Sequence, residues 1–353
     1  MALPDSAPAG FAPLHIDPMQ MLANAPALVM NDPTLIDTTS LQIAGQTTQF
    51  FVQQGPYAVL YTEALTIHAP VRITGALPLI VVALGHIEVG HDISLFGDGA
   101  TGGPGALTSG PGVGGDGALV VLPGNLRVTS GGGGGSYGSP GASGSGPASP
   151  NGAAGSTYGE QLTGPLQGGA AGGGGGGLGG SVAAGAGGGA LQLSSAVSIT
   201  VGAFAINAGG GGGDGGLGIE AGGGGGAGGE IVLEAPSLIV RGVIAANGGG
   251  GGGGGNGENG NTRGGSPGQD GLASGGVAMG GLDGIPSGNP GGDGAAGVSD
   301  AFVDATRGSI GNPQGSGGGG GAGRIWLRFR SSGQVELTGS VISPPPGMDA
   351  TLP

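Results

Sequence analysis

The stretch GEIVLEAPSLIVRGVIAANGGGGGGGG, residues 229–255, joins two different kinds of sequence. Its first part alternates apolar and polar residues or runs apolar, with a glycine at a corner, and is typical of short β-strands. Its second part is eight consecutive glycines, Gly248 to Gly255. Because glycine loses more backbone freedom on folding than any other residue, an ordered run of this length needs a specific structural reason.

The strand-like pattern recurs along the chain, in residues 64–97, 117–131, 189–210, 229–249 and 323–344. An offset of 40 residues aligns the third and fourth of these phrases, pairing Leu193 with Leu233, Ile199 with Ile239, Gly202 with Gly242 and Asn207 with Asn247. Such self-similarity indicates stacked repeats. We therefore expect an all-β fold, a parallel β-helix or solenoid, in which each coil stacks on the previous one. The alternative is a β-sandwich with glycine-rich hairpin loops.

Long glycine-rich inserts separate the phrases, at about 98–116, 131–188, 209–229 and 248–322. Collagen is excluded because it needs a strict Gly-X-Y period. Polyglycine can instead adopt an extended helix with three residues per turn, and several such segments can bond laterally through their backbones. We expect polyglycine II bundles of this kind, with Gly248, Gly251 and Gly255 packed inside. The competing interpretation is that the inserts are flexible linkers.

The pattern divides the chain into three parts. Residues 1–60 hold few glycines and are expected to form an N-terminal head or cap, with a short helix over 19–30 that is cut at Pro26. Residues 61–346 are the expected solenoid with its inserts, and 347–353 a C-terminal tail. Pro344 to Pro346 come before this tail, and proline cannot donate to a strand ladder.

Composition excludes several classes of protein. The 353 residues include 97 Gly and 25 Pro, which by itself suggests disorder. However, 37% of the residues are hydrophobic and only 8% are charged, the reverse of a disordered chain. The net charge is −14 and all eight basic residues are Arg, so neither nucleic acid nor an anionic membrane surface is an expected partner.

No targeting or membrane-spanning segment is apparent. The first ten residues, MALPDSAPAG, lack the basic and apolar regions of a secretory signal. The longest apolar run, residues 76–84, is far shorter than the roughly 20 residues that span a bilayer. Cysteine is absent, which excludes disulfides and thiolate metal sites.

The sequence predicts no catalytic site and no cofactor. A phosphate-binding P-loop needs a lysine, and the chain has none. Two matches to the nucleophile motif Gly-x-Ser-x-Gly surround Ser136 and Ser266. Neither lies between a predicted strand and helix, and Pro267 lacks the N–H that the oxyanion hole requires. An enzyme acting on polysaccharides is disfavoured because one Trp, four Tyr and seven Phe are few aromatic residues for binding sugars.

Metal sites are weakly indicated and none is predicted. His86 and Glu88 share one face of a strand near His91, but solvated side chains explain this grouping equally well. Carboxylates suited to Ca²⁺ lie in the inserts or beside them, at Asp98, Asp116, Asp214, Asp283 and Asp293. Calcium-binding repeats need stacked copies of their motif, and the motif occurs here once.

The segment RIWLRFR holds the one basic cluster. Arg324, Trp326, Arg328 and Arg330 are expected on one face of a strand, with Ile325, Leu327 and Phe329 on the other. The first set is either the outer face of a last coil or a surface that docks on the acidic body of another subunit.

The phrases 228–253 and 317–341 resemble the glycine-rich, surface-exposed proteins of myxobacteria, in which a β-solenoid alternates with glycine-rich segments. The similarity covers roughly residues 64–344 and implies no catalytic residue. A looser likeness, carried by the inserts alone, is to phage tail-tip adhesins with polyglycine bundles.

Two functions follow as hypotheses. The first is a non-enzymatic structural protein that assembles with itself into a filament, sheath or surface layer, outside the cell or at its surface. The second is an adhesin whose insert tips, such as 136–164 and 256–316, contact a cell-surface receptor or glycan.

Overall fold

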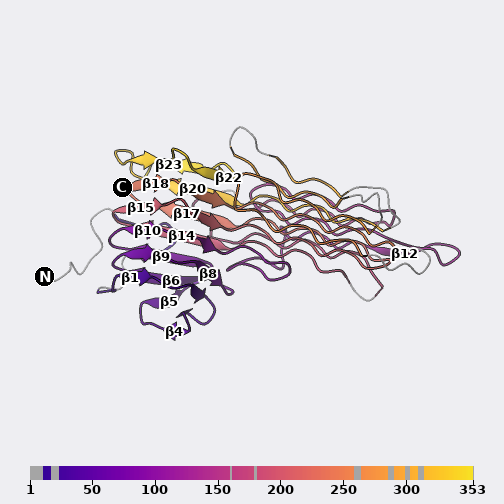
Figure 1. Cartoon of the computed structure of the whole chain (residues 1–353), viewed down its shortest axis with the longest axis horizontal. Coiled ribbons are helices and arrows are strands. Elements are labelled where there is room, and N and C mark those ends of the chain that lie inside the picture. The colour runs from indigo at the N-terminus through magenta and orange to yellow at the C-terminus, as the bar shows by residue number, and fades with distance from the viewer. Residues whose placement is uncertain are drawn as a thin grey trace.

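The computed structural model describes residues 11–16, 24–159, 161–178, 181–257, 264–284, 290–298, 303–308 and 314–352. Figure 1 shows a body of stacked strands and a bundle of glycine-rich segments that extends from one side of it. Every regular element among the described residues is a strand, and none of them is helical. The all-β class expected from the sequence is therefore confirmed.

Three sheets make up the body. Sheet A contains, in spatial order, β1 (Leu28–Met30), β7 (Leu65–Ile67), β10 (Ile87–Val89), β15 (Ser198–Val201), β18 (Ser237–Val240) and β21 (Val335–Glu336). Sheet B contains β22 (Val341–Ser343), β19 (Val243–Ala245), β16 (Ala205–Asn207), β11 (Ile93–Ser94), β8 (Val71–Thr74), β2 (Thr34–Asp37), β3 (Gln42–Ile43) and β4 (Gln46–Thr47). Sheet C contains β23 (Gly347–Asp349), β20 (Arg324–Arg328), β17 (Glu230–Glu234), β14 (Ala190–Ser195), β9 (Leu79–Ala83), β6 (Tyr57–Thr62) and β5 (Phe51–Gln54).

The chain visits these sheets in a fixed order. From β7 onward each circuit adds one strand to sheet A, then one to sheet B, then one to sheet C. Strands of successive circuits pair in parallel, for example β9 with β14, β14 with β17 and β17 with β20. Among the described strands of the three sheets, the antiparallel pairs are β2 with β3, β3 with β4 and β5 with β6. The sheets are therefore mostly parallel, as expected.

Inward-facing side chains of each sheet form apolar ladders. In sheet C the register aligns Leu60, Val81, Leu193, Leu233 and Leu327, all of which are buried. Similar ladders follow sheets A and B, and the three meet in one core cluster. Full burial of one such side chain contributes roughly 1.5–3 kcal/mol. Stacking of circuits, and not the local preference of very short strands, therefore stabilises the body.

The repeat shifts by one residue at each corner. The register pairs Leu193 with Leu233, Ile199 with Leu238 and Asn207 with Ala245, so the offset falls from 40 to 39 and then to 38. The first predicted pair is confirmed, whereas the predicted partners Ile239 and Asn247 are wrong. The reason is that each of the two intervening corners is one residue shorter in the later circuit.

Residues 24–62 belong to the sheets and do not form a separate head. β1, β2 and β6 make the first circuit and pair in parallel with β7, β8 and β9. Only β3, β4 and β5 resemble a cap, since they end sheets B and C with antiparallel strands. The helix expected over 19–30 is wrong in its described part, because Leu28–Met30 is β1; residues 17–23 lie outside the described part.

The chain continues as a strand beyond Pro344 to Pro346. Gly347–Asp349 is β23, which pairs in parallel with β20 and completes a last circuit. The prolines occupy the corner between β22 and β23, where no ladder hydrogen bond is required of them. Residues 347–349 are therefore part of sheet C, whereas the sequence predicted a tail.

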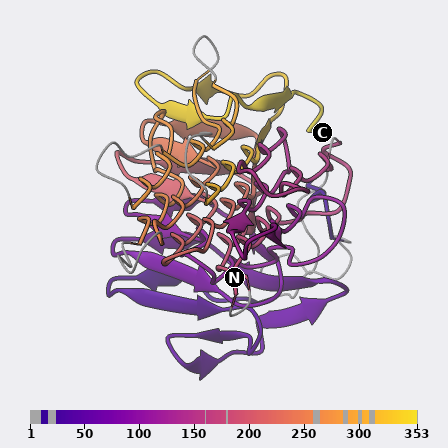
Figure 2. The ribbon, with the colours of Figure 1, turned by 90° about the vertical axis from the view of Figure 1, so that its right-hand side faces the viewer.

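All long glycine-rich excursions leave the body at the same corner. Residues 95–189, 208–229 and 246–323 each follow a strand of sheet B and return to a strand of sheet C. Seen along the bundle, their segments lie side by side in one group (Figure 2). The shared corner brings segments together that are far apart in the sequence.

Successive residues of the run Gly248 to Gly255 form hydrogen bonds with different neighbouring segments in turn. Residues three apart donate their backbone N–H groups to the same neighbouring segment, over 2.8 to 3.0 Å. Gly248 and Gly251 donate to the carbonyl groups of Ala295 and Gly292. Gly249, Gly252 and Gly255 donate to those of Gly226, Gly223 and Glu220. Gly250 and Gly253 donate to those of Gln269 and Ser266. This interval matches the three residues per turn of a polyproline II-type helix. Carbonyl groups of three neighbouring segments thus accept these hydrogen bonds, and the N–H of Gly254 donates to Asp283 Oδ1 at 2.7 Å.

The glycines expected inside the bundle have no space for a side chain. A Cβ atom on Gly248 would lie 2.0 Å from the carbonyl oxygen of Gly320. On Gly251 it would lie 2.3 Å from that of Gly317, and on Gly255 2.4 Å from that of Gly218. All three contacts are with backbone, which cannot rotate away as a flexible side chain does. Glycine is therefore required here by close approach of neighbouring segments.

Residues 117–131, expected as a coil of the solenoid, form a separate hairpin. β12 (Leu119–Val121) and β13 (Arg127–Thr129) pair antiparallel with each other alone. Figure 1 places β12 at the end of the bundle farthest from the body. Gly124 and Asn125, with φ of 83° and 63°, reverse the chain between the strands. The inserts predicted at 98–116 and 131–188 are consequently parts of one excursion.

Substitution of Gly251 tests this packing. Gly251→Ala places a methyl group against the backbone of Gly317, and we expect it to lower the free energy of unfolding by roughly 1–3 kcal/mol. Thermal unfolding followed by circular dichroism measures the effect. Gly276→Ala is the control, because its Cβ would meet Ser274 Oγ at 3.5 Å, and it should change stability by less than about 0.5 kcal/mol. Equal melting temperatures for the two variants would contradict close packing at Gly251.

Candidate functional site

The outer face of sheet C is shielded from solvent, because other parts of the chain cover it. Side chains that point away from the core include Gln192 and Ser194 on β14 and Glu230 and Glu234 on β17, and all four are buried. A second apolar cluster lies over this face, with Phe11, Ile16 and Leu166 packed against the sheet. Residues 11–16 and the loop around Leu166 therefore form a layer over the outside of the body.

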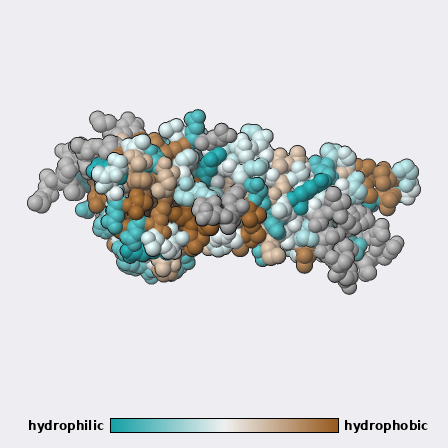
Figure 3. Space-filling model, turned by 90° about the horizontal axis from the view of Figure 1, so that it is seen from above, coloured by the Kyte–Doolittle hydropathy of each residue, from teal (hydrophilic) through white to brown (hydrophobic). Residues whose placement is uncertain are grey.

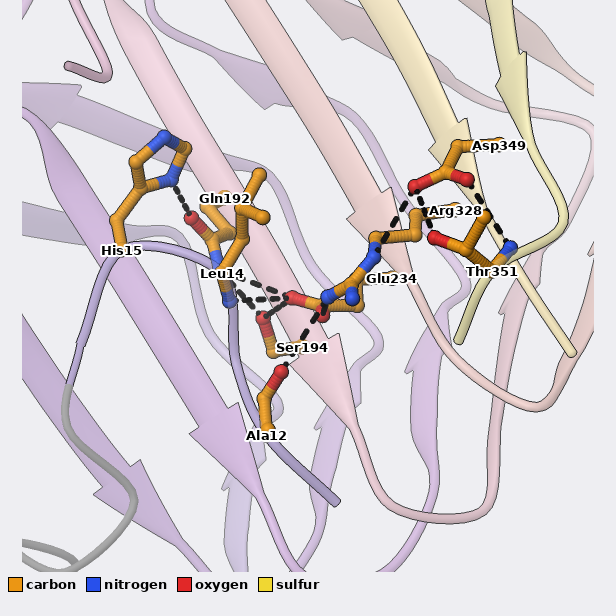
Figure 4. Close-up of polar contacts among 9 residues, drawn as sticks. All are labelled: Ala12, Leu14, His15, Gln192, Ser194, Glu234, Arg328, Asp349 and Thr351. Carbon is orange, nitrogen blue, oxygen red and sulfur yellow. Dashed lines mark hydrogen bonds and ion pairs between the residues drawn. The ribbon is translucent and has the colours of Figure 1, made fainter. Parts of the chain in front are cut away.

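Glu234 is the centre of a buried polar network (Figure 4). Its Oε1 pairs with Arg328 Nη1, and its Oε2 accepts hydrogen bonds from Ser194 Oγ at 2.8 Å and Gln192 Nε2 at 3.1 Å. Arg328 Nε also donates to Asp349 Oδ2 at 3.2 Å. Burial raises the pKa of Glu234, and the charge of Arg328 and the hydrogen bonds oppose this rise.

The same network fastens residues 11–16 to the sheet. The backbone N–H of Leu14 donates to Glu234 Oε2 at 3.1 Å, and Arg328 Nη1 donates to the carbonyl of Ala12 at 3.3 Å. The ring nitrogens of His15 bond to Gln192 Oε1 and, at 2.7 Å, to the carbonyl of Gly164. Buried charges on β17 and β20 thus hold an N-terminal segment that is more than 200 residues away in sequence.

Glu230 joins the body to the glycine-rich bundle. Its Oε2 accepts hydrogen bonds from Tyr137 Oη at 2.7 Å and from the backbone N–H of Gln167 at 3.1 Å. Burial raises the pKa of Glu230 to about 7 against the opposing effect of these hydrogen bonds. Tyr137 is fully buried, and its ring packs on Tyr158 with 4.6 Å between the centroids. Residues 137 and 158 therefore lie at the body, so 136–164 is not an insert tip as a whole.

The predicted assembly residues have different environments. Ile325 and Leu327 point into the core, which leaves Arg324, Trp326 and Arg328 on the outer face of β20. Arg328 forms ion pairs with Glu234 and Asp349, so its charge is neutralised within the molecule. The backbones of Arg330 and Thr351 form an isolated antiparallel β-bridge. Arg324 and Trp326 line a groove beside Pro344 to Pro346.

The aspartates of the inserts accept hydrogen bonds from glycine N–H groups. Asp116 bonds to Gly174 N and Asp283 to Gly254 N, both at 2.7 Å, and Asp293 to Gly280 N at 2.8 Å. Within the described residues no three His, Cys, Asp or Glu side chains are grouped so as to hold a metal ion. Asp98, another candidate, pairs with Arg72 at 3.5 Å.

Exposed apolar side chains gather at the far end of the bundle. The β12–β13 hairpin joins other turns there, because Thr129 Oγ1 bonds to the carbonyl of Ile219 and Ala221 N bonds to that of Gly176. The exposed set comprises Val121, Leu122, Leu126, Leu178 and Leu217, the last of which is 65% exposed. Figure 3 shows hydrophobic surface at this extremity. We call these five residues the apolar tip.

Sequence reasoning did not find the buried charges of sheet C or the segment that covers them. Its expectation was that outward-facing residues on a solenoid are solvated. One signal was present: Val232 lies between Glu230 and Glu234 on the same face, and an apolar residue there indicates a covered surface. The apolar tip was missed because residues 117–131, which hold Val121, Leu122 and Leu126, were expected as a coil of the body, and because Leu178 and Leu217 are single residues among glycines.

No protein-family model, curated protein or solved structure matches the chain. Within the described residues, no helix has the length and apolar character needed to cross a membrane.

Replacement of Glu230 tests its environment. Its folded pKa of about 7 exceeds the ordinary 4.5, so the protein should lose stability as pH rises from 4.5 through 7, by up to roughly 3 kcal/mol. Glu230→Gln should therefore be more stable than the parent at pH 8 and similar to it at pH 4.5. Chemical denaturation across this pH range measures the difference. Glu88→Gln, at an exposed position, should follow the parent, and a Glu230→Gln profile parallel to the parent would refute the assignment.

Removing one partner of the buried ion pair should be costly. Arg328→Met leaves Glu234 without its counter-charge, and we expect a loss of about 3–5 kcal/mol in the free energy of unfolding. The double variant Arg328→Met, Glu234→Met should recover most of this loss. Arg241→Met is the matched control, because its pair with Glu336 is largely exposed and should contribute less than about 1 kcal/mol. Urea denaturation compares the three, and a small effect of Arg328→Met alone would contradict the network.

Proposed function

We propose that this protein is a non-enzymatic display module that acts outside the cell or at its surface. In this proposal the three sheets are the faces of a parallel β-solenoid, and the excursions form a polyglycine II bundle that carries binding loops away from it. The single observation that supports this most is the apolar tip, five exposed hydrophobic residues at the end of the bundle farthest from the body. Exposed apolar patches on soluble proteins are typical of interaction sites.

The hydrogen bonds between the segments of the bundle favour a role in displaying the apolar tip over a role as a flexible linker. A flexible chain would present its tip over a wide range of positions, whereas segments bonded on several sides hold one position. Glu230 and Tyr137 connect the bundle to sheet C, so that the tip is held relative to the body. A rigid presentation lowers the conformational entropy lost on binding.

Self-assembly is the second candidate function, and the last circuit favours it. β21, β22 and β23 stand at the ends of their sheets and offer unpaired strand edges. At the other end β3, β4 and β5 cover sheets B and C, so β1 is the one strand among the described residues that offers a parallel edge there. Electron microscopy of the purified protein separates the candidates: filaments support assembly, and discrete elongated particles support display.

Polar substitution at the apolar tip tests the display function. The triple variant Leu122→Ser, Leu126→Ser, Leu217→Ser should reduce retention of the purified protein on whole cells of the producing strain by about tenfold or more, as expected for loss of an apolar contact. The control is Val29→Ser, Leu35→Ser, which alters exposed apolar residues of the body, 51% and 49% exposed. Equal retention of the two variants, measured in a sedimentation assay, would reject the tip as the binding site.

A further inference from the structure

A groove on the body lies apart from the apolar tip. Its floor is β20, with Arg324 and Trp326, and its walls are the corner Pro344 to Pro346 and the glycine-rich residues 138–139 and 322–323. The volume is about 490 Å³, which lies within the range of small-ligand sites and is small for a protein interface. Proline has a fixed φ, so the wall formed by the corner is rigid and the groove is preformed.

Trp326 lies flat on the sheet at the floor of the groove. Gly347 is its register partner on β23, and a Cβ atom there would lie 2.1 Å from Cε3 and Cζ3 of the indole. The ring therefore covers the position where any other residue would place its side chain. This arrangement gives the groove a flat aromatic surface, which favours a ligand with a flat, weakly polar face. Trp326 is the one tryptophan of the chain.

Arg324 gives the groove a positive charge in a molecule of net charge −14. Other arginines form ion pairs, as Arg72 does with Asp98 and Arg241 with Glu336. Within the described residues, Arg324 has no carboxylate within 4 Å, and its Nε is buried without a hydrogen-bond partner. Its register partner Glu230 has a pKa raised to about 7 by burial and so offsets the charge incompletely. The groove therefore suits an anion.

We propose that this groove binds a uronic acid unit of an acidic polysaccharide, with the sugar ring on Trp326 and its carboxylate on Arg324. The C–H groups of a sugar ring carry partial positive charge and pack on the negative face of an indole. A guanidinium matches the planar carboxylate with paired hydrogen bonds. Ser139, whose Oγ accepts a hydrogen bond from Ala322 N, keeps its hydroxyl proton for a sugar oxygen. A polyphosphate fits less well, because it has no ring of C–H groups to pack on the face of Trp326.

Tryptophan fluorescence tests the proposal directly, because Trp326 is the one tryptophan of the chain and all tryptophan emission therefore comes from the groove. Titration of the full chain with tri-galacturonate should give a saturable change in emission. The methyl ester of the same trisaccharide should bind about tenfold more weakly or worse, because it lacks the carboxylate charge. Added salt should weaken the acid more than the ester. No saturable change up to millimolar sugar, or equal affinity for acid and ester, would overturn the proposal.

Two variants separate ligand binding from folding. Arg324→Gln should lower the affinity for tri-galacturonate about tenfold with an unchanged melting temperature, whereas Arg241→Gln, directly after β18 of sheet A, should leave the affinity unchanged. Calorimetric titration of Trp326→Ala should show loss of binding. If emission changes with protein concentration in the absence of sugar, and Arg324→Gln abolishes that change, the groove binds a second copy of the chain and the sugar proposal is wrong.

Discussion

The lateral hydrogen bond between glycine backbones is the interaction on which this structure depends. In an ordinary core, side chains separate the backbones and bury apolar area. In the bundle, a run such as Gly248 to Gly255 approaches its neighbours so closely that a Cβ atom would lie about 2 Å from a carbonyl oxygen. The approach lets every donor find an acceptor on an adjacent segment. Because the bonds lead to several segments at once, each segment depends on more than one neighbour for its hydrogen bonds.

The strands of the body hold both ends of each glycine-rich excursion. Each excursion starts in sheet B and finishes in sheet C, and parallel stacking of circuits sets adjacent starts one strand apart. The entropy of closing a long loop rises only slowly with its length, so excursions of very different size are compatible with one corner. Aspartates at 116, 283 and 293 accept N–H groups where a glycine segment offers no carbonyl. The apolar ladders of the core and the polar bundle thus stabilise each other through shared strand ends.

The outer face of sheet C is where the two parts are joined. Glu230 reaches Tyr137 at the base of the bundle, and Glu234 with Arg328 holds residues 11–16. Buried charges are expensive to desolvate, and their value here is orientation more than net stability. The apolar tip lies at the far end of the bundle, whereas the groove beside Trp326 lies on the body. Two surfaces of different chemistry, one apolar and one with an arginine, are therefore present on one molecule.

The all-β class, the stacked repeat and the shared face of Ile325 and Leu327 could be predicted from the sequence, because alternation and self-similarity are local patterns. The glycine runs indicated packing against close neighbours, because ordering them costs much entropy, and flexible linkers stood as the alternative. The folded chain was needed to establish which segments are neighbours, that 117–131 is a hairpin and that Gly347–Asp349 is a strand. It also decided that Arg328 is neutralised inside while Arg324 faces a groove. Apart from the hairpin, whose paired residues are local, these outcomes depend on contacts between residues far apart in the chain, from 21 residues for Arg328 with Asp349 to 316 for Arg328 with Ala12, and no local pattern encodes such distances.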